Sequence, residues 1–235
     1  GQDNDGNQRT AVCCLSSLNI DTYDQWSEDP QFIEDVMRFL DNVMTDFIDR
    51  APDEFAHAKY SAMRERSVGL GVMGLHSYFQ QKNIPFGSVM SKVWNKKIFK
   101  NIQEKVDLAS VSLAEERGAC PDAAEYGMKE RFSNKTAIAP TASISIICGG
   151  SSPGIEPIAA NSYTHKTLSG SFNVRNKYLK KILQKYKKDT DDVWSTITTN
   201  QGSVAHLDFL TPDEKDTFKT AFEIDQRWIV ELGAD

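Results

Sequence analysis

Two parts of this 235-residue chain carry residues that could do chemistry. Near the start, Cys13 and Cys14 form an adjacent pair of thiols, the side chains best suited to redox or nucleophilic steps. Further along, residues 135–157 read KTAIAPTASISIICGGSSPGIEP, an apolar stretch that leads into a run of small hydroxyl residues. Such an order can present free backbone N–H groups to an anion.

The second segment has two interpretations. Pro140 should end a short apolar strand, because proline has no N–H for a sheet ladder. Thr141 and Ser143 are favourable N-cap residues for a following helix, whose first N–H groups have no internal partner and whose dipole favours negative charge. The segment is therefore either the start of an ordinary capped helix or an anion-binding site. Taken alone, the residues favour the capped helix, because such caps are common and anion sites are rare.

The cysteine pair is constrained by strand geometry. Neighbouring residues on a strand point to opposite faces, so Cys13 and Cys14 are poorly placed to bond each other. One would face a barrel or sheet interior and the other a helix layer, and a chemical partner must come from another segment. Cys120 and Cys148 are interpreted as structural, since a buried cysteine usually behaves as a small hydrophobic residue.

Composition excludes several classes of function. The net charge of −6 argues against a nucleic-acid or anionic-membrane binder. No apolar run approaches the length of a membrane span, and residues 1–12 are unlike a secretory signal. Four cysteines are too few for a disulfide scaffold, which favours the reducing cytoplasm. The four histidines do not lie at metal-ligand spacing with Cys or Asp, so no metal site is expected.

The hydrophobic pattern predicts an α/β fold of buried strands separated by long helices. Residues 1–8 read as a polar extension, and residues 9–235 as the folded domain. The expected elements are a strand buried on both faces at 10–20, helices at 30–50, 63–81 and 94–117, a strand or hairpin at 163–174, a basic amphipathic helix at 176–187, a short helix at 190–198 and a last helix from Thr211 to about Leu232.

A dinucleotide-binding pattern also occurs, in Gly69, Gly71 and Gly74. It has meaning only after a strand, before a helix, and with an acidic residue about twenty positions on. We expect no strand before it, and the residue twenty positions beyond Gly74 is Trp94. The glycines are therefore interpreted as allowing a helix to approach another backbone closely.

Six motifs in order resemble the catalytic large subunit of ribonucleotide reductases, most closely the class I enzymes that reduce diphosphates. They are RTAVCCLSSLN, ERSVGLGVMGL, ERGACP, IAPTASISIICGGSSPGIEP, YTHKTLSGSF and FEIDQRWIVELGAD. The resemblance covers residues 9–235 and implies part of a ten-stranded α/β barrel. In that family a thiyl radical abstracts the ribose 3′ hydrogen, and two cysteines on neighbouring strands then supply reducing equivalents.

The resemblance assigns roles to five residues. Cys13 corresponds to the family's second redox cysteine, which gives up hydrogen and electrons as the 2′ hydroxyl leaves as water. Cys14 corresponds to no functional residue and is expected to face outward. The loop that holds the substrate's 5′-diphosphate corresponds to Thr141, Ala142, Ser143 and Ile144. This match shifts the interpretation of the hydroxyl run from a capped helix to an anion site.

Other parts of the family pattern lie outside these residues. The thiyl cysteine, the first redox cysteine, the effector-binding region and the radical-transfer tyrosines have no match here. The chain is therefore interpreted as a fragment, inactive alone, whether a split-gene product, a processed piece or a partial sequence. The expected partners are a complementing large-subunit chain, a metal-containing small subunit that generates the radical, and thioredoxin or glutaredoxin as reductant, with no cofactor bound directly. The alternative is a non-catalytic nucleotide-binding or interaction remnant, and an adenosylcobalamin-dependent relative has a similar phosphate loop.

Overall fold

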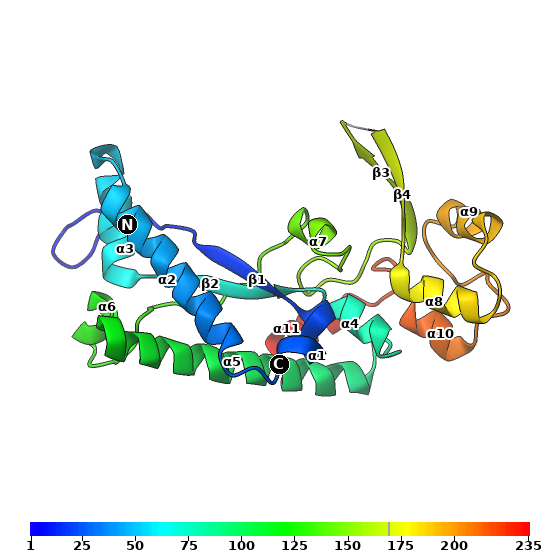
Figure 1. Cartoon of the computed structure of the whole chain (residues 1–235), viewed down its shortest axis with the longest axis horizontal. Coiled ribbons are helices and arrows are strands. Elements are labelled where there is room, and N and C mark those ends of the chain that lie inside the picture. The colour runs from blue at the N-terminus through cyan, green and yellow to red at the C-terminus, as the bar shows by residue number, and fades with distance from the viewer. Residues whose placement is uncertain (169) are drawn as a thin grey trace. The chain divides into compact units, whose positions relative to one another are not determined.

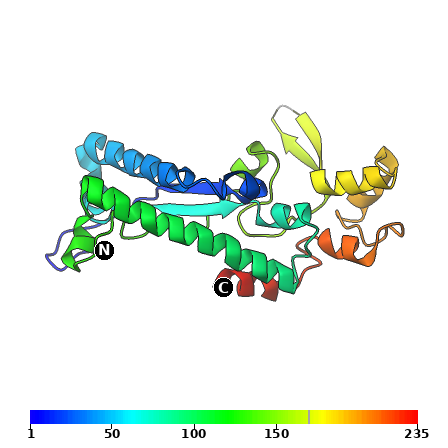
Figure 2. The ribbon, with the colours of Figure 1, turned by 60° about the horizontal axis from the view of Figure 1, so that its bottom comes forward.

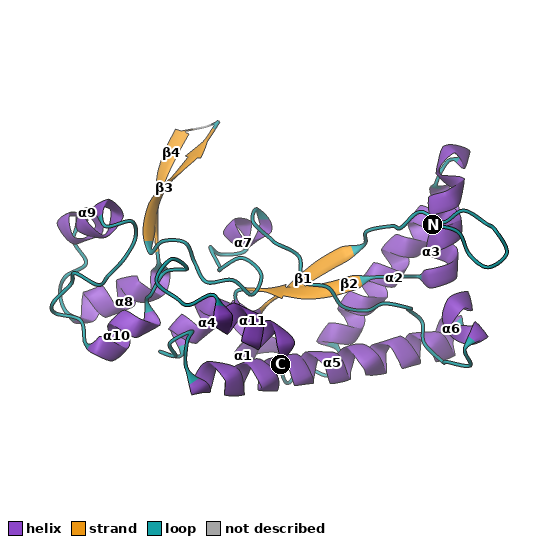
Figure 3. Ribbon diagram, turned by 180° about the vertical axis from the view of Figure 1, so that it is seen from behind, coloured by secondary structure: helices purple, strands orange, loops and turns teal. Residues whose placement is uncertain are grey.

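The structure, a computed structural model, describes residues 1–168 and 170–235. Figure 3 shows its two pairs of strands among helices. In chain order the elements are β1 (Leu15–Asn19), η1 (Ile20–Thr22), α1 (Tyr23–Trp26), α2 (Phe32–Arg50), η2 (Asp53–Phe55), α3 (Ala56–Glu65), β2 (Gly69–Met73), α4 (Leu75–Gln81), α5 (Val89–Arg117), α6 (Pro121–Glu125), α7 (Ile144–Ile147), β3 (Ser162–Thr167), β4 (Gly170–Arg175), α8 (Lys177–Lys185), α9 (Asp191–Thr199), α10 (Pro212–Thr217) and α11 (Arg227–Ala234).

The chain divides into two compact units. Unit 1 consists of Gly1–Leu18, Tyr23–Val72 and Ile98–Pro140. Unit 2 consists of Asn19–Thr22, Met73–Lys97 and Thr141–Asp235. Cys13 therefore lies in unit 1, and the hydroxyl run that begins at Thr141 lies in unit 2.

Unit 1 is built on the paired strands β1 and β2, which point the same way in Figure 2. The Gly69 N–H donates to the Cys14 carbonyl at 2.9 Å, at the start of this pairing. On the other edge of β2, Leu70 forms a parallel bridge with Thr136. The predicted strand before Pro140 is therefore reduced to a single bridge in an extended segment.

The strand predicted at residues 10–20 is shorter and less buried than expected. It begins at Leu15, whose side chain is exposed, and Leu18 is its buried residue. A strand is buried on both faces only when layers cover both. Only Leu18 of the five residues of β1 is buried, so both faces of this strand are not covered within the described chain.

The helix predicted at residues 63–81 is wrong. Helix α3 ends at Glu65, and Arg66 follows it in a left-handed conformation with φ of 44°. The strand β2 comes next, buried at every position, before α4 begins at Leu75. The glycines in this strand do permit close approach, because a Cβ on Gly71 would overlap the carbonyl oxygen of Ala137. The expected close packing is present, but a strand provides it.

Helices α2 and α5 confirm two predictions, and α5 ends before Gly118, which has a φ of +89°. Only some of the apolar residues of α2 are buried. Its apolar core residues are Ile33, Met37, Leu40 and Met44. Phe39, another apolar residue of this helix, is 63% exposed. Aromatic and aliphatic residues occupy more than one face of α2, so spacing alone did not fix its orientation.

A buried ionic cluster ties unit 1 together around Asp41 of α2. The Asp41 carboxylate is fully buried and accepts from the guanidinium groups of Arg66, Arg117 and Arg131. Arg131 also donates to the carbonyls of Arg117 and Gly118, at the end of α5. One carboxylate thus joins α2 to the segments after α3 and α5.

Unit 2 confirms the predicted hairpin and helix starts. Figure 1 shows the hairpin of β3 and β4 rising from the start of α8 beside α9. Asn176 caps α8, Thr190 caps α9, and Thr211 forms a capping box with Glu214 at α10. Their helices share a hydrophobic core made of Tyr178, Leu179, Leu183, Trp194, Ile197, Val204, Leu207, Leu210 and Phe218.

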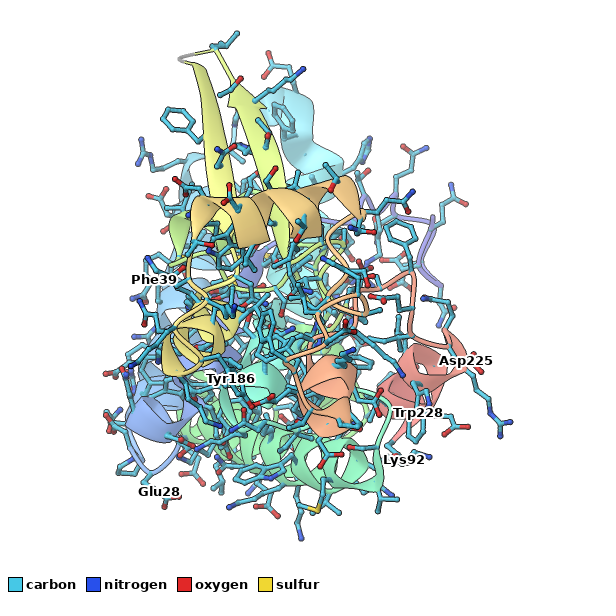
Figure 4. All side chains as sticks on the ribbon, turned by 90° about the vertical axis from the view of Figure 1, so that its right-hand side faces the viewer. Glu28, Phe39, Lys92, Tyr186, Asp225 and Trp228 are labelled. Atoms are coloured by element: carbon cyan, nitrogen blue, oxygen red, sulfur yellow. The ribbon has the colours of Figure 1, made fainter. Side chains whose placement is uncertain are left out.

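The single last helix predicted up to Leu232 is instead two helices, α10 and α11. Between them the Ala221 N–H donates to the Ile158 carbonyl at 2.8 Å, a tertiary bond that an unbroken helix would not allow. Helix α11 is held by Lys92, which donates to Glu231 and lies 5.1 Å from the centre of the Trp228 ring. Figure 4 shows Lys92 beside Trp228.

No helix within the described part of the chain is long and apolar enough to cross a membrane. Among residues 1–168 and 170–235, no three His, Cys, Asp or Glu side chains gather as a metal site would require.

Candidate functional site

The hydroxyl run folds into a closed loop within unit 2. Thr141 is buried, and its backbone is left-handed with a φ of 52°. Its Oγ1 accepts a hydrogen bond from the Gly154 N–H at 2.8 Å, and its carbonyl accepts from the Ser145 N–H at 3.0 Å. Thr141 therefore joins the two ends of the loop that contains α7.

The tip of this loop presents free donors. Ala142, Ser143 and Ile144 are all exposed. Ser143 occupies the N-cap position of α7, but its side chain makes no capping hydrogen bond, unlike the ordinary cap that the residues alone favoured. Within the described chain, the backbone N–H groups of these three residues have no acceptor. Three neighbouring N–H groups and one hydroxyl are thus available to an external anion.

The segment after α7 is anchored by polar side chains. Ser151 Oγ donates to Asn19 at 3.1 Å and to Asp21 at 3.2 Å. Asn19 Nδ2 donates to the Cys148 carbonyl at 3.2 Å. Ser152 binds the first turn of α4, because its Oγ accepts a hydrogen bond from the Ser77 N–H at 3.1 Å. The N-terminus of α4, which the glycine pattern suggested for a dinucleotide, is therefore occupied by the chain itself.

The two adjacent thiols lie in different environments. Cys13 is exposed, whereas Cys14 is half-buried, with its Sγ 3.9 Å from the Leu40 carbonyl oxygen. Burial, and to a smaller extent the neighbouring Cys13, raises the pKa of the Cys14 thiol. Both thiols are free. The side chain predicted to be chemical is therefore the accessible one, and Cys14 packs toward helix α2, which is the helix layer expected for one of the two thiols.

The other two cysteines also differ. Cys120 is buried at the start of α6, as expected of a structural residue. Cys148 is exposed, so it does not have the buried structural environment that its apolar surroundings suggested. Asn19 and Asp21, which anchor the loop, were missed by sequence reasoning. The only available signal was a pair of polar residues directly after a strand, and that pattern is common in ordinary turns.

Comparison with known proteins decides the family. The model of "Ribonucleotide reductase, barrel domain" matches residues 2–130 and 121–235. This chain belongs to the ribonucleotide reductase barrel-domain family. The α/β barrel class predicted from the motifs is confirmed, and the mixed helices and strands described above are part of that barrel domain.

The relatives within the ribonucleotide reductase family are large subunits. A ribonucleoside-diphosphate reductase large subunit of Invertebrate iridescent virus 6 is 48% identical over 97% of this chain and 24% of its own length. One of Caenorhabditis elegans is 30% identical over 96% of this chain. The solved class Id ribonucleotide reductase alpha subunit of Actinobacillus ureae is 40% identical with a TM-score of 0.87, covering 95% of this chain and 41% of that one. The chain thus spans well under half the length of these reductases.

Proposed function

We propose that this chain is part of the large subunit of a ribonucleoside-diphosphate reductase, and that residues 141–144 hold the substrate's diphosphate. The observation that carries the proposal is the set of three unpartnered N–H groups at Ala142, Ser143 and Ile144. The large-subunit relatives support the reaction class.

The loop suits an anion more than a neutral ligand. Each hydrogen bond to a charged acceptor contributes roughly 1.5–3 kcal/mol, so two or three are sufficient for useful binding. Ser143 Oγ is exposed at the tip and would add a donor. Thr141 has its Oγ1 committed as an acceptor for Gly154, so its main role would be to close the loop while its hydroxyl proton remains available.

Cys13 would supply reducing equivalents for the same reaction. Two thiols lose two electrons and two protons and form a disulfide, while the ribose 2′ carbon loses its hydroxyl as water and gains hydrogen. The exposure of Cys13 supports this role, because a thiol that exchanges with a second cysteine and an external reductant must be reachable. Its partner cysteine would come from another part of the subunit.

The remaining assignments concern the partners of the chain and its location. The radical would come from a separate metal-containing small subunit, and thioredoxin or glutaredoxin would reduce the disulfide. A complementing large-subunit chain would bring the thiyl cysteine, and the assembly would work in the cytoplasm. The division into an extension at 1–8 and a barrel portion at 9–235 stays a prediction. Gln2 and Gln8 pair as an antiparallel bridge in that extension.

Titration calorimetry of the full chain with inorganic pyrophosphate and with a ribonucleoside diphosphate tests the loop. We expect both to bind, and Ser143→Ala to weaken both by about tenfold, the loss of one charge-assisted hydrogen bond. The control is Ser171→Ala, an exposed serine on β4 that should leave affinity unchanged. If the folded chain binds neither anion, the diphosphate assignment is wrong.

The redox role needs the assembled reductase. We expect Cys13→Ser to abolish turnover with thioredoxin as reductant, and Cys14→Ser to retain most of it. Full thioredoxin-dependent turnover in Cys13→Ser would contradict the assignment.

A further inference from the structure

A buried carboxylate lies behind the diphosphate loop in unit 2. Asp21, in η1, is 4% exposed. Its two oxygens accept from three donors, the Tyr178 hydroxyl, the Lys177 ammonium and Ser151 Oγ. Burial raises the pKa of Tyr178, and its hydrogen bond to Asp21 raises it further, so this phenol remains a donor. Asp21 thus accepts hydrogen bonds from side chains of two segments that are distant from it in the sequence.

Lys177 connects this centre to the loop itself. Its Nζ donates both to Asp21 Oδ2 and to the Gly149 carbonyl, the latter at 3.1 Å. Gly149 and Gly150 both have left-handed backbones, with φ of 87° and 65°. Two consecutive glycines leave a segment with many accessible conformations. Lys177 fixes this pair from outside, because no side chain of the pair can do so.

The anchored segment is hydrogen-bonded back onto α7. The Cys148 N–H donates to the Ile144 carbonyl at 2.8 Å, and the Ser151 N–H donates to the Ser145 carbonyl at 3.0 Å. A displacement of residues 148–151 would therefore move the start of α7. The free N–H groups of the loop belong to this same start.

We propose that Lys177 and Asp21 are positioning residues that hold residues 148–151 and, through α7, aim the N–H groups of residues 142–144 at the substrate's diphosphate. This rests on the function proposed above for the loop. Neither side chain needs to touch the substrate. Lys177 is one of several lysines along α8, and its two contacts distinguish it from Lys180, which has no ion pair within the described chain.

The experiment compares lysine variants of the full chain in two measurements. Hydrogen exchange without ligand reports the order of residues 148–151, and calorimetry with inorganic pyrophosphate reports the loop's affinity. Lys177→Met removes both contacts, whereas Lys177→Arg keeps a cation that can donate to Asp21 and to Gly149. Lys180→Met is the matched control on the exposed side of α8.

We expect Lys177→Met to accelerate exchange at residues 148–151 and to weaken pyrophosphate binding by about tenfold, with circular dichroism unchanged. Lys177→Arg should recover most of both losses, and Lys180→Met should change neither. If Lys177→Met has the same exchange rates and the same pyrophosphate affinity as the wild type, the inference is wrong and the proposed function is unaffected. If Lys177→Met accelerates exchange at residues 148–151 but the wild-type chain does not bind pyrophosphate, the proposed function is wrong. The positioning role toward a diphosphate is then wrong as well.

Discussion

Gly71 lies so close to the carbonyl oxygen of Ala137 that a side chain at position 71 would overlap it. The contact is made by backbone atoms, which cannot rotate away as a flexible side chain can. It brings β2 against the extended segment that leads to Pro140, and the parallel bridge between Leu70 and Thr136 lies beside it.

Gly71→Ala should therefore destabilise the chain by about 1–3 kcal/mol, the usual effect of overpacking, as measured by urea unfolding. The matched control is Gly233→Ala in α11, where the nearest atom to an added Cβ is 3.9 Å away. That change should be neutral or stabilising by a few tenths of a kcal/mol, because alanine favours helix. Equal stability of wild type and Gly71→Ala would contradict the close contact.

Asp41→Asn should be among the most destabilising polar substitutions. It leaves the buried guanidinium groups of Arg66 and Arg131 without their carboxylate, a change that typically costs about 3–5 kcal/mol. Asp46→Asn removes an exposed pair with Arg50 on the same helix and should change stability by less than about 1 kcal/mol. Similar unfolding midpoints for the two variants would refute the structural role of the cluster.

The cluster around Asp41 should also make the stability of the fold decrease at acid pH. Burial alone raises the pKa of Asp41, but hydrogen bonds from Arg131 and Arg117 and the charge of Arg66 outweigh it, and the net pKa lies below its usual 3.8. A depressed carboxyl pKa stabilises the fold above the unfolded value, and this contribution is lost as pH falls through the folded value. The loss from Asp41 should therefore appear below about pH 4.

His76 should make stability fall in a milder acid range. Burial lowers its pKa from 6.5 to about 3, and its Nδ1 accepts from the Ile158 N–H at 3.0 Å, so it is neutral in the fold. The unfolded chain takes up the proton below pH 6.5, and so stability should fall by up to about 1.4 kcal/mol per pH unit between pH 6 and pH 4. Urea titrations at several pH values measure this slope. His76→Gln should reduce it and the exposed His206→Gln should not; an unchanged slope in His76→Gln would exclude His76 as its source.

Iodoacetamide should label Cys13 well ahead of Cys14. Cys13 is exposed, whereas Cys14 is half-buried with a raised pKa, so less of it is thiolate at neutral pH. We expect a rate ratio of about ten or more, measured by peptide mass spectrometry. Cys148 should label readily, and the buried Cys120 slowly, as internal references. Faster labelling of Cys14 would reverse the assignment of the accessible thiol.

Local signals were enough to predict several elements. Asn176, Thr190 and Thr211 each lie at a helix start and accept from backbone N–H groups two or three residues on. Such caps depend on a few neighbouring residues, and so the sequence reveals them. The strand or hairpin expected at residues 163–174 is the antiparallel hairpin of β3 and β4.

The wrong prediction for strand β2 has its cause in tertiary contacts. Strand β2 reads GLGVM, which lacks the usual density of β-branched residues, and it is a strand because Leu70 and Gly69 pair with segments distant in the chain. The site shows the same division. The motif pointed to residues 141–144 for the proposed diphosphate loop, but the contact between Lys177 and Asp21 joins positions more than 150 residues apart, which no local pattern reports.

Thr141 also bears on how this loop could change under selection. A β-branched residue with a φ of 52° opposes its own intrinsic backbone preference, and it remains there because Gly154 needs its hydroxyl as an acceptor. Glycine or asparagine would suit the backbone better at that position. Substitution at position 141 would therefore trade a relaxed backbone against the loss of the bond from the Gly154 N–H, and unfolding measurements on a library randomised there would show which of the two effects is larger.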